Sequence, residues 1–195
     1  MAVTSGQLAA LNDFRGVTVM ETAVATRRRA PVAARPVAQA DSPSGSEDVR
    51  LKFSKMVLGL KGAKAGVLRS PLQTHNAVRE QSLSYEALLH LISHLKGTKE
   101  SEVAKVVGVS DRTLRRHREK PETPMSSDVA GKTLLFAQVL AQAVQVFGSQ
   151  ADAEEWLNRP ALALANARPI ELLQTVQGAD LVKDQLVRLE YGVFS

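Results

Sequence analysis

The sequence contains no cysteine among its 195 residues. Disulfide bonds, thiolate nucleophiles and zinc or iron–sulfur sites with cysteine ligands are therefore excluded. No apolar run approaches the roughly 20 residues that a membrane-spanning helix needs. The amino terminus also lacks a charged start followed by an apolar segment and a small-residue cleavage site. We therefore expect a cytoplasmic protein with no membrane contact.

Residue patterns typical of catalysis or metal binding are also scarce. The chain has four histidines, of which His90 and His94 share a helix face without a convincing third ligand. No nucleophile with an oriented base and no phosphate-cradling glycine-rich loop is visible. The sequence thus predicts a protein that is not an enzyme and has no cofactor or metal.

Charge is distributed unevenly, although the net charge is only +5. Residues 1–120 hold 20 lysines and arginines against 11 acidic residues, whereas residues 121–195 hold 5 against 9. A basic half attracts polyanions and an acidic half does not, which indicates two surfaces for two partners. A basic excess that is only solvated surface would give the same counts and remains the alternative.

The first 50 residues are predicted to be a disordered tail of unassigned role. Residues 22–47 consist mainly of Ala, Pro, Arg, Ser and Gly without an aromatic residue, and they bury too little to offset the entropy of ordering. The triple arginine Arg27 to Arg29 is compatible with phosphate contacts or with a plain flexible tail. Met20 leaves open a translation start at that position.

From residue 82 the apolar periodicity is helical, and no stretch alternates for long enough to form a sheet. Ser84 is suited to cap a first helix that Gly97 ends, and a second helix ends at Gly108. A third follows almost at once, so residues 51–124 are predicted to form a helix-turn-helix domain. The small side chain of Ala104 allows a close helix crossing, and Gly108 can adopt the positive φ of a sharp turn.

The third helix, from Asp111 to about Lys120, has Leu114 on its inner face and a basic outer face. Such a helix can reach base edges and phosphates in a DNA major groove. His117 stands where this motif usually has an apolar residue, and partial exposure of its ring is expected. An ordinary three-helix bundle with a charged surface is the alternative. The residues expected to contact DNA are Ser110, Arg112, Thr113, Arg115, Arg116 and Arg118.

The remaining chain is predicted to form further helices. A long helix ends at Gly148, a short one covers residues 153–157, and another starts at Pro169, a favoured first position. Gly178 is expected to close that helix, and the last one covers residues 179–190. It is predicted to place Leu181, Val182, Leu186 and Leu189 on a shared apolar face.

The order of residues in this half is recognisable: Val146-Phe147-Gly148, Trp156-Leu157 to Pro160, Pro169-Ile170-Glu171-Leu172-Leu173, Thr175, Gly178 and Arg188-Leu189-Glu190-Tyr191-Gly192-Val193. It resembles the toxin-binding domain of Xre/MbcA/ParS antitoxins over residues 126–195. Residues 78–120 resemble the Xre-like DNA-binding domain of that family more loosely. The chain departs from the family at Gly131-Lys132, where Asp-Arg is usual, and at Gln81, where glycine is common.

The resemblance implies an all-α antitoxin with a helix-turn-helix domain followed by a small toxin-binding domain at residues 125–195. It implies a homodimer that binds operator DNA to repress its own operon. The implied second partner is a RES-domain toxin that uses NAD and is encoded beside the antitoxin. The residues expected to contact the toxin are Trp156, Arg168, Glu171, Tyr191, Gly192, Val193, Phe194 and Ser195.

The last five residues are expected to block the substrate cleft of the toxin. They project the apolar side chains of Val193 and Phe194 and the carboxylate of Ser195, and a cleft for an anionic dinucleotide has donors for a carboxylate. A frayed tail is the alternative for this end. Trp156 is compatible with a core or an interface position. The competing function is a stand-alone transcriptional regulator whose carboxy-terminal domain only dimerises.

Overall fold

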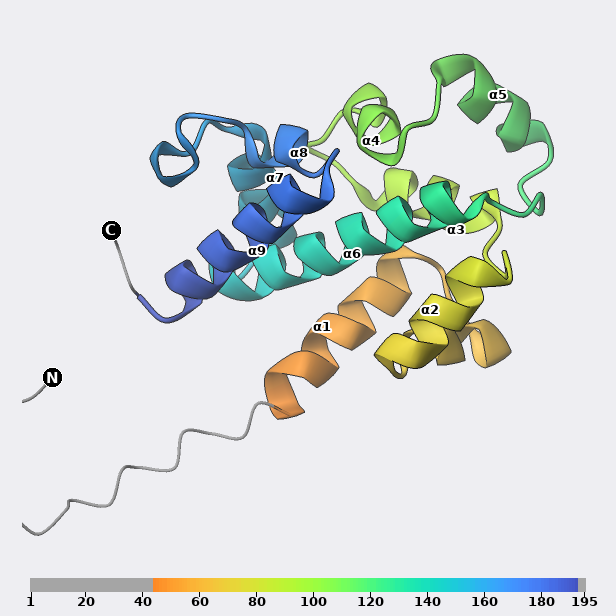
Figure 1. Ribbon diagram of the computed structural model, residues 1–195, viewed down its shortest axis with the longest axis horizontal. Coiled ribbons are helices and arrows are strands. Elements are labelled where there is room, and N and C mark those ends of the chain that lie inside the picture. Colours follow the sequence, from red (N-terminus) through yellow and green to blue (C-terminus); the bar gives the residue numbers. More distant parts are fainter. Residues whose placement is uncertain (1–43, 193–195) are drawn as a thin grey trace, which may run out of the picture. The chain divides into compact units, whose positions relative to one another are not determined.

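The computed structural model describes residues 44–192, and every regular element in this range is a helix (Figure 1). The predicted all-α fold class is therefore confirmed for the described residues. Residues 1–43 lie outside them, so the predicted disorder of this stretch, its triple arginine and the alternative start at Met20 stay predictions.

The first helix, α1 (Ser44–Val57), begins inside the stretch that was expected to be a tail. The boundary predicted at residue 50 is therefore too late. Arg50 donates a hydrogen bond from Nε to Gln145 of α6, and its guanidinium forms an ion pair with Glu190 of α9 at 3.3 Å. Gln145 and Glu190 lie 95 and 140 positions after Arg50 in the sequence. The composition around Arg50 therefore does not reveal these contacts.

The first half of the described chain consists of short helices. Ser70 caps α2, because its Oγ accepts the N–H of Gln73 at 3.2 Å. Helix α3 ends at His94 rather than at the predicted Gly97, since Leu95 already has extended backbone angles. The elements that follow α1 are the 3-10 helix η1 (Gly62–Leu68), α2 (Pro71–Arg79), α3 (Tyr85–His94), α4 (Glu100–Val107) and α5 (Asp111–Glu119).

The second half begins with the long helix α6, capped by Ser126 and ended by Gly148 at a positive φ of 81°. The prediction that Gly178 closes α8 was wrong, because Gly178 lies in the first turn of α9. The reason is that the Thr175 hydroxyl caps α9 by accepting the Gly178 N–H at 3.1 Å. The elements are α6 (Ser127–Phe147), α7 (Gln150–Asn158), the 3-10 helix η2 (Leu162–Leu164), α8 (Pro169–Leu172) and α9 (Val176–Glu190).

Helix α6 forms the centre of the core, where it packs against α1, α2, α4, α7 and α9 (Figure 1). Its side chains Phe136, Val139 and Leu140 are completely buried. One hydrophobic cluster extends from Val57 to Leu186, so the helices before and after residue 124 share a core. A division of the chain into domains at residue 124 stays a prediction.

By length and composition alone, α6 is also the one helix of the described chain that could cross a membrane. However, 61% of its most apolar window is buried inside the protein. Its apolar character is therefore explained by its central position among the other helices.

Candidate functional site

Helices α4 and α5 meet at a short turn built around Gly108. This residue has φ 75° and ψ 31°, the left-handed conformation that was predicted for it. Ala104 and Leu114 are 2% and 0% exposed and fill the joint between the helices, as the spacing predicts. Helices α4 and α5 are therefore joined by a tight turn and share a buried joint.

The amino-terminal end of α5 is fixed by a side-chain cap. Ser110 Oγ accepts the backbone N–H of Thr113 at 3.1 Å, and the two hydroxyl oxygens are 2.8 Å apart. Ser110 is exposed and Thr113 is half-buried. The end of the helix that enters a DNA groove in this motif is thus held rigid.

Arginines dominate the exposed side of α5. Arg118 forms an ion pair with Glu100 of α4, which occupies its guanidinium. The other three form no ion pair with any residue that the structure describes, and their side chains are exposed. These three are Arg112, Arg115 and Arg116. Nη2 of Arg116 lies 3.2 Å from Nε2 of the neighbouring His117, within hydrogen-bond distance. Arg112 and Arg115 are therefore the two that are available for phosphates or base edges.

The ring of His117 is buried, which corrects the expectation of partial exposure. It is 7% exposed and stacks on the ring of Tyr85 from α3, with centroids 3.7 Å apart and planes inclined by 4°. Burial, with a smaller effect from the charge of Arg116, lowers the pKa of His117 from its ordinary value of 6.5. A neutral, flat ring thus takes the place of the apolar residue that is usual in this motif.

Acidification is expected to destabilise the protein through His117. Above pH 6.5 the ring is neutral in both states, because its pKa is 6.5 when unfolded and lower when folded. As the pH falls below 6.5, the unfolded chain binds the proton first, so stability drops until the pH passes the folded pKa. Thermal unfolding at pH 7 and pH 5 measures this loss. His117→Phe should show a smaller loss, and an equal loss would assign the pH dependence to other groups.

In the carboxy-terminal segment, Trp156 of α7 lies between core and surface. Its ring packs against Phe147 at the end of α6, with centroids 5.4 Å apart and planes inclined by 36°. Both rings border a shallow pocket of about 380 Å³ that Asp152, Glu155 and Arg159 also line. Trp156 therefore has a packing role and also an accessible edge.

Arg168 and Glu171, both expected to contact the toxin, contact each other. Arg168 Nη1 donates to Glu171 Oε1 at 3.1 Å, and its Nε donates to the backbone oxygen of Asn158 at the same distance. Its Nη2 also lies 3.9 Å from a carboxylate oxygen of Glu102 on α4. Arg168 thus connects α8 with α7 and with the helix-turn-helix.

The chain leaves α9 at Tyr191, whose side chain is 77% exposed, and at Gly192, which has φ 67°. Val193, Phe194 and Ser195 lie outside the described residues, so their expected contacts stay predictions. The hydrogen bonds, ion pairs and ring contacts of the described residues do not join Trp156 or Tyr191 to Arg168. The structure therefore brings together only Arg168 and Glu171 among the predicted toxin contacts.

Sequence reasoning missed Glu154, a carboxylate of α7 that is only 1% exposed. Its Oε2 accepts the backbone N–H groups of Lys96, Gly97 and Thr98 at 3.1, 2.6 and 2.9 Å. Gln150 donates to its other oxygen at 2.7 Å. Glu154 thus ties α7 to the loop before α4. No sequence spacing signals this contact, because the three partners are backbone groups 56 to 58 positions away.

A second missed feature is the solvent side of α9. Val176, Leu181 and Val187 are 71%, 56% and 41% exposed. The prediction that Leu181 shares a face with Val182 and Leu186 was wrong, since those two face the core and Leu181 lies about 100° around the helix from Val182. Spacing alone gives no signal for this exposed face, because apolar residues occur on both sides of α9.

Comparisons with known proteins address the same segment. Residues 142–192 match the family model of the antitoxin Xre/MbcA/ParS C-terminal toxin-binding domain. A protein named antitoxin Xre from Yersinia enterocolitica is 35% identical over 98 residues, which are 49% of this chain and 64% of that protein. Antitoxin Xre from Pseudomonas putida is 30% identical over 81 residues, covering 42% of this chain and 50% of that protein.

A third protein named antitoxin Xre, from Photorhabdus laumondii, is 27% identical over 95 residues, which are 48% of this chain and 64% of that protein. The alignments thus span between half and slightly less than two thirds of the relatives' lengths. The matched segment, 142–192, covers the end of α6 and everything described after it. The predicted resemblance is confirmed: this chain is similar to Xre-type antitoxins, and its last helices match their C-terminal toxin-binding domain.

Proposed function

We propose that this protein is an antitoxin that neutralises its toxin by direct contact through the carboxy-terminal segment. The observation that carries the proposal is the exposed apolar end of α9, where Tyr191 is 77% exposed, within the segment that matches a toxin-binding domain. A large aromatic side chain in such a position is typical of an interface residue. As an antitoxin, the protein acts by binding in the cytoplasm and uses neither catalysis nor a cofactor.

The proposed partner is a RES-domain toxin that uses NAD. A site for an anionic dinucleotide presents hydrogen-bond donors and positive charge. The end of the chain, from Tyr191 to Ser195, offers apolar side chains and a carboxylate to such a cleft. We therefore expect this end to block the cleft, while Trp156 and the Arg168–Glu171 pair support docking.

Operator binding is proposed for α5. Three exposed arginines without ion pairs in the described part of the chain support it, together with the rigid cap at Ser110. A homodimer would place two copies of α5 against the half-sites of a two-fold symmetric operator. Such binding lets the antitoxin repress its own operon.

Two variants test toxin neutralisation and operator binding separately, because each variant is measured for both protection and operator affinity. Deletion of Tyr191–Ser195 should abolish protection in cells that co-express the neighbouring RES-domain protein and leave operator affinity unchanged. Arg112→Ala with Arg115→Ala should weaken operator binding about 100-fold and leave protection intact, because each lost base or phosphate contact is worth about 1–3 kcal/mol. Growth assays measure protection, and fluorescence anisotropy at fixed physiological salt measures operator affinity.

The matched control for the arginines is Arg69→Ala with Arg79→Ala, which removes two exposed arginines outside α5. It should leave both readouts close to wild type. Full protection by the truncated protein would refute the proposal that Tyr191–Ser195 block the cleft of the toxin. Unchanged operator affinity of the α5 variant would place DNA binding elsewhere. If no growth-arresting partner exists, the stand-alone regulator becomes the better function.

A further inference from the structure

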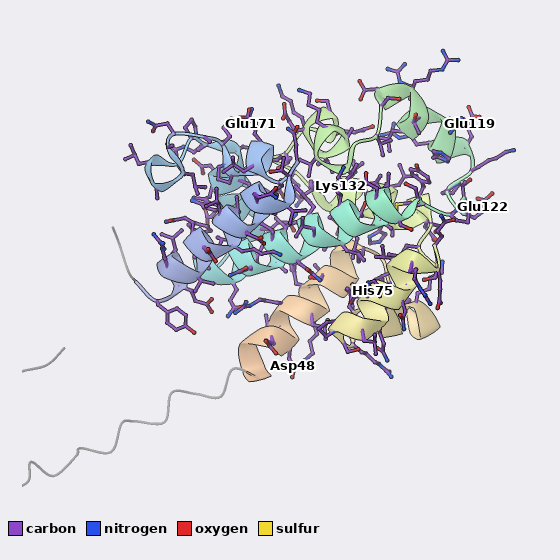
Figure 2. All side chains as sticks on the ribbon, viewed as in Figure 1. Asp48, His75, Glu119, Glu122, Lys132 and Glu171 are labelled. Carbon is purple, nitrogen blue, oxygen red and sulfur yellow. The ribbon has the colours of Figure 1, made fainter. Side chains whose placement is uncertain are left out.

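A pocket of about 760 Å³ lies where α1, α2, α6 and α9 come together. Helices α1 and α2 each pack against α6, and the pocket opens between them (Figure 1). Figure 2 labels one lining residue on each of these two helices, Asp48 on α1 and His75 on α2. Pockets that hold small ligands typically have volumes of about 300–1,000 Å³. The pocket is therefore large enough for a small-molecule ligand.

The pocket lies largely outside the segment that matches the toxin-binding domain. Of the described residues that line it, only Gln142 and Lys183 fall within residues 142–192. The others come from α1, from η1 and α2, and from the middle of α6. A role for this pocket is therefore separate from the proposed contact with the toxin.

A buried amide without a partner lines the pocket. Gln142 of α6 is only 8% exposed, and its side chain forms no hydrogen bond with any residue that the structure describes. In the described chain, the one fully enclosed side-chain nitrogen or oxygen without a partner belongs to His117, so the amide of Gln142 keeps an opening into the pocket. Burial of an amide without hydrogen bonds is costly. Gln142 therefore offers both a donor and an acceptor to a ligand.

A second buried polar group, the hydroxyl of Ser54 on α1, also lines the pocket. Ser54 is 3% exposed, and its hydroxyl donates to the backbone oxygen of Ala137 at 3.4 Å. The proton of the hydroxyl is thus used, whereas its oxygen can still accept a hydrogen bond. A peptide group carries one N–H donor and one C=O acceptor. The hydroxyl of Ser54 and the amide of Gln142 therefore match the groups of a peptide backbone.

The walls of the pocket carry charges of both signs. The carboxylates belong to Glu47 and Asp48 of α1. The cations belong to Arg69, which lies just before α2, and to Lys183 of α9. None of these four side chains forms an ion pair with another residue of the described chain. Opposite charges thus remain unpaired on different walls of one pocket.

We propose that this pocket binds a short peptide with free ends. The ammonium group of the peptide faces the two carboxylates of α1, and its carboxylate faces Arg69 and Lys183. Its backbone groups bond to the buried amide and the buried hydroxyl. A ligand of one charge would be attracted by one wall and would meet like charge at the other. A zwitterionic peptide is the ligand that uses both walls and both buried groups.

The test titrates the full chain with tri-alanine and with two blocked forms of this peptide. Tri-alanine is a suitable probe because the expected contacts involve only the backbone and the two ends. Isothermal titration calorimetry should show saturable binding. N-acetylation removes the ammonium group and amidation removes the carboxylate, and each should weaken binding about 5-fold, as for the loss of one partly exposed ion pair. Absence of saturable binding, or equal affinity for all three forms, would overturn the proposal.

Two variants locate the peptide in the pocket. Gln142→Met keeps the length of the side chain but removes both hydrogen-bonding groups, so it should weaken tri-alanine binding about 10-fold. Arg69→Glu with Lys183→Glu places negative charge where the carboxylate of the peptide is expected. This variant should bind the amidated peptide more tightly than the free peptide, which inverts the wild-type order. General structural damage would weaken both peptides alike and would leave their order unchanged.

The matched controls change the same residue types outside the pocket. They are Gln185→Met, at a half-buried position of α9, and Arg79→Glu with Lys120→Glu, at two exposed positions. Both controls should bind tri-alanine like wild type, and thermal unfolding without peptide checks that every variant folds. Wild-type affinity of Gln142→Met, or an unchanged order of the two peptides in the charge-reversed variant, would place the peptide elsewhere and overturn the proposal.

Discussion

Replacing Gly178 with alanine is expected to lower the free energy of unfolding by about 3 kcal/mol. The expected sign is opposite to that of helix propensity, which favours alanine by about 1 kcal/mol. A Cβ at this position would lie 2.1 Å from the backbone oxygen of Leu172 and 2.9 Å from Thr175 Oγ1. Because the Leu172 oxygen belongs to the backbone, α8 and α9 must move apart to admit the methyl group. Urea unfolding measures the loss.

Gly131→Ala is the matched control, since Gly131 is also a helical glycine. An added Cβ there would lie 4.0 Å from Val78 Cγ1, an ordinary van der Waals distance. This substitution should therefore be neutral or stabilise the protein by up to about 1 kcal/mol. Equal stability of both variants would show that α8 and α9 relax without cost. The Gly178 variant should also protect less well against the toxin, because α9 is displaced.

Replacing Glu154 with alanine is expected to cost about 4 kcal/mol of stability. The substitution removes the acceptor of three backbone N–H groups, of which that of Thr98 is buried and those of Lys96 and Gly97 are partly buried. Each unsatisfied buried donor costs about 1–3 kcal/mol, although water entering the space of the lost side chain offsets part of this. Chemical unfolding gives the total, and hydrogen exchange at Lys96, Gly97 and Thr98 shows whether the loss is local.

Glu154→Gln should have an intermediate effect of about 2 kcal/mol, because the amide keeps one oxygen acceptor and loses the charge. Glu155→Ala is the control from the neighbouring position. The carboxylate of Glu155 is exposed and pairs with Arg159 one turn along the same helix, so its loss should cost less than about 1 kcal/mol. Similar losses for Glu154 and Glu155 would mean that the three backbone bonds contribute little.

The helices with strong local signals were predictable from the sequence. Gly108 and Gly148 end their helices as predicted, and Ser110 and Ser126 cap the helices that follow them. Ser84 stands at the start of α3, as predicted, but its side chain accepts no capping hydrogen bond. These features depend on residues within a few positions of one another. Local chemistry alone therefore fixes the turn of the helix-turn-helix and both ends of α6.

The features that sequence reasoning missed depend on distant partners. The start of α1 depends on Arg50 reaching α6 and α9, and the burial of His117 depends on the ring of Tyr85. Gly178 was interpreted as a helix terminator, but its lack of a side chain is required by the backbone of α8. In each case the deciding contact is tertiary, and propensity and capping rules do not include it.

The same limit applies to the candidate site. The basic face of α5 follows from residue types at helical spacing and could be predicted. The exposed side of α9, with Val176 and Val187, could not be separated from a core face by spacing alone, because apolar residues occur on both sides of that helix. The packing of α9 against α6, α8 and η2 decides that Val182 and Leu186 are buried and that Val176 and Val187 are exposed.

The central place of α6 also governs when a newly made chain can fold. Helices α1, α2 and α4 pack on α6, so a nascent chain on the ribosome has no complete core until residue 147 has emerged. A product of interrupted translation that stops before α6 would expose Leu88 and Val103, which are fully buried in the folded chain. Such fragments should be degraded by proteases rather than persist in the cell.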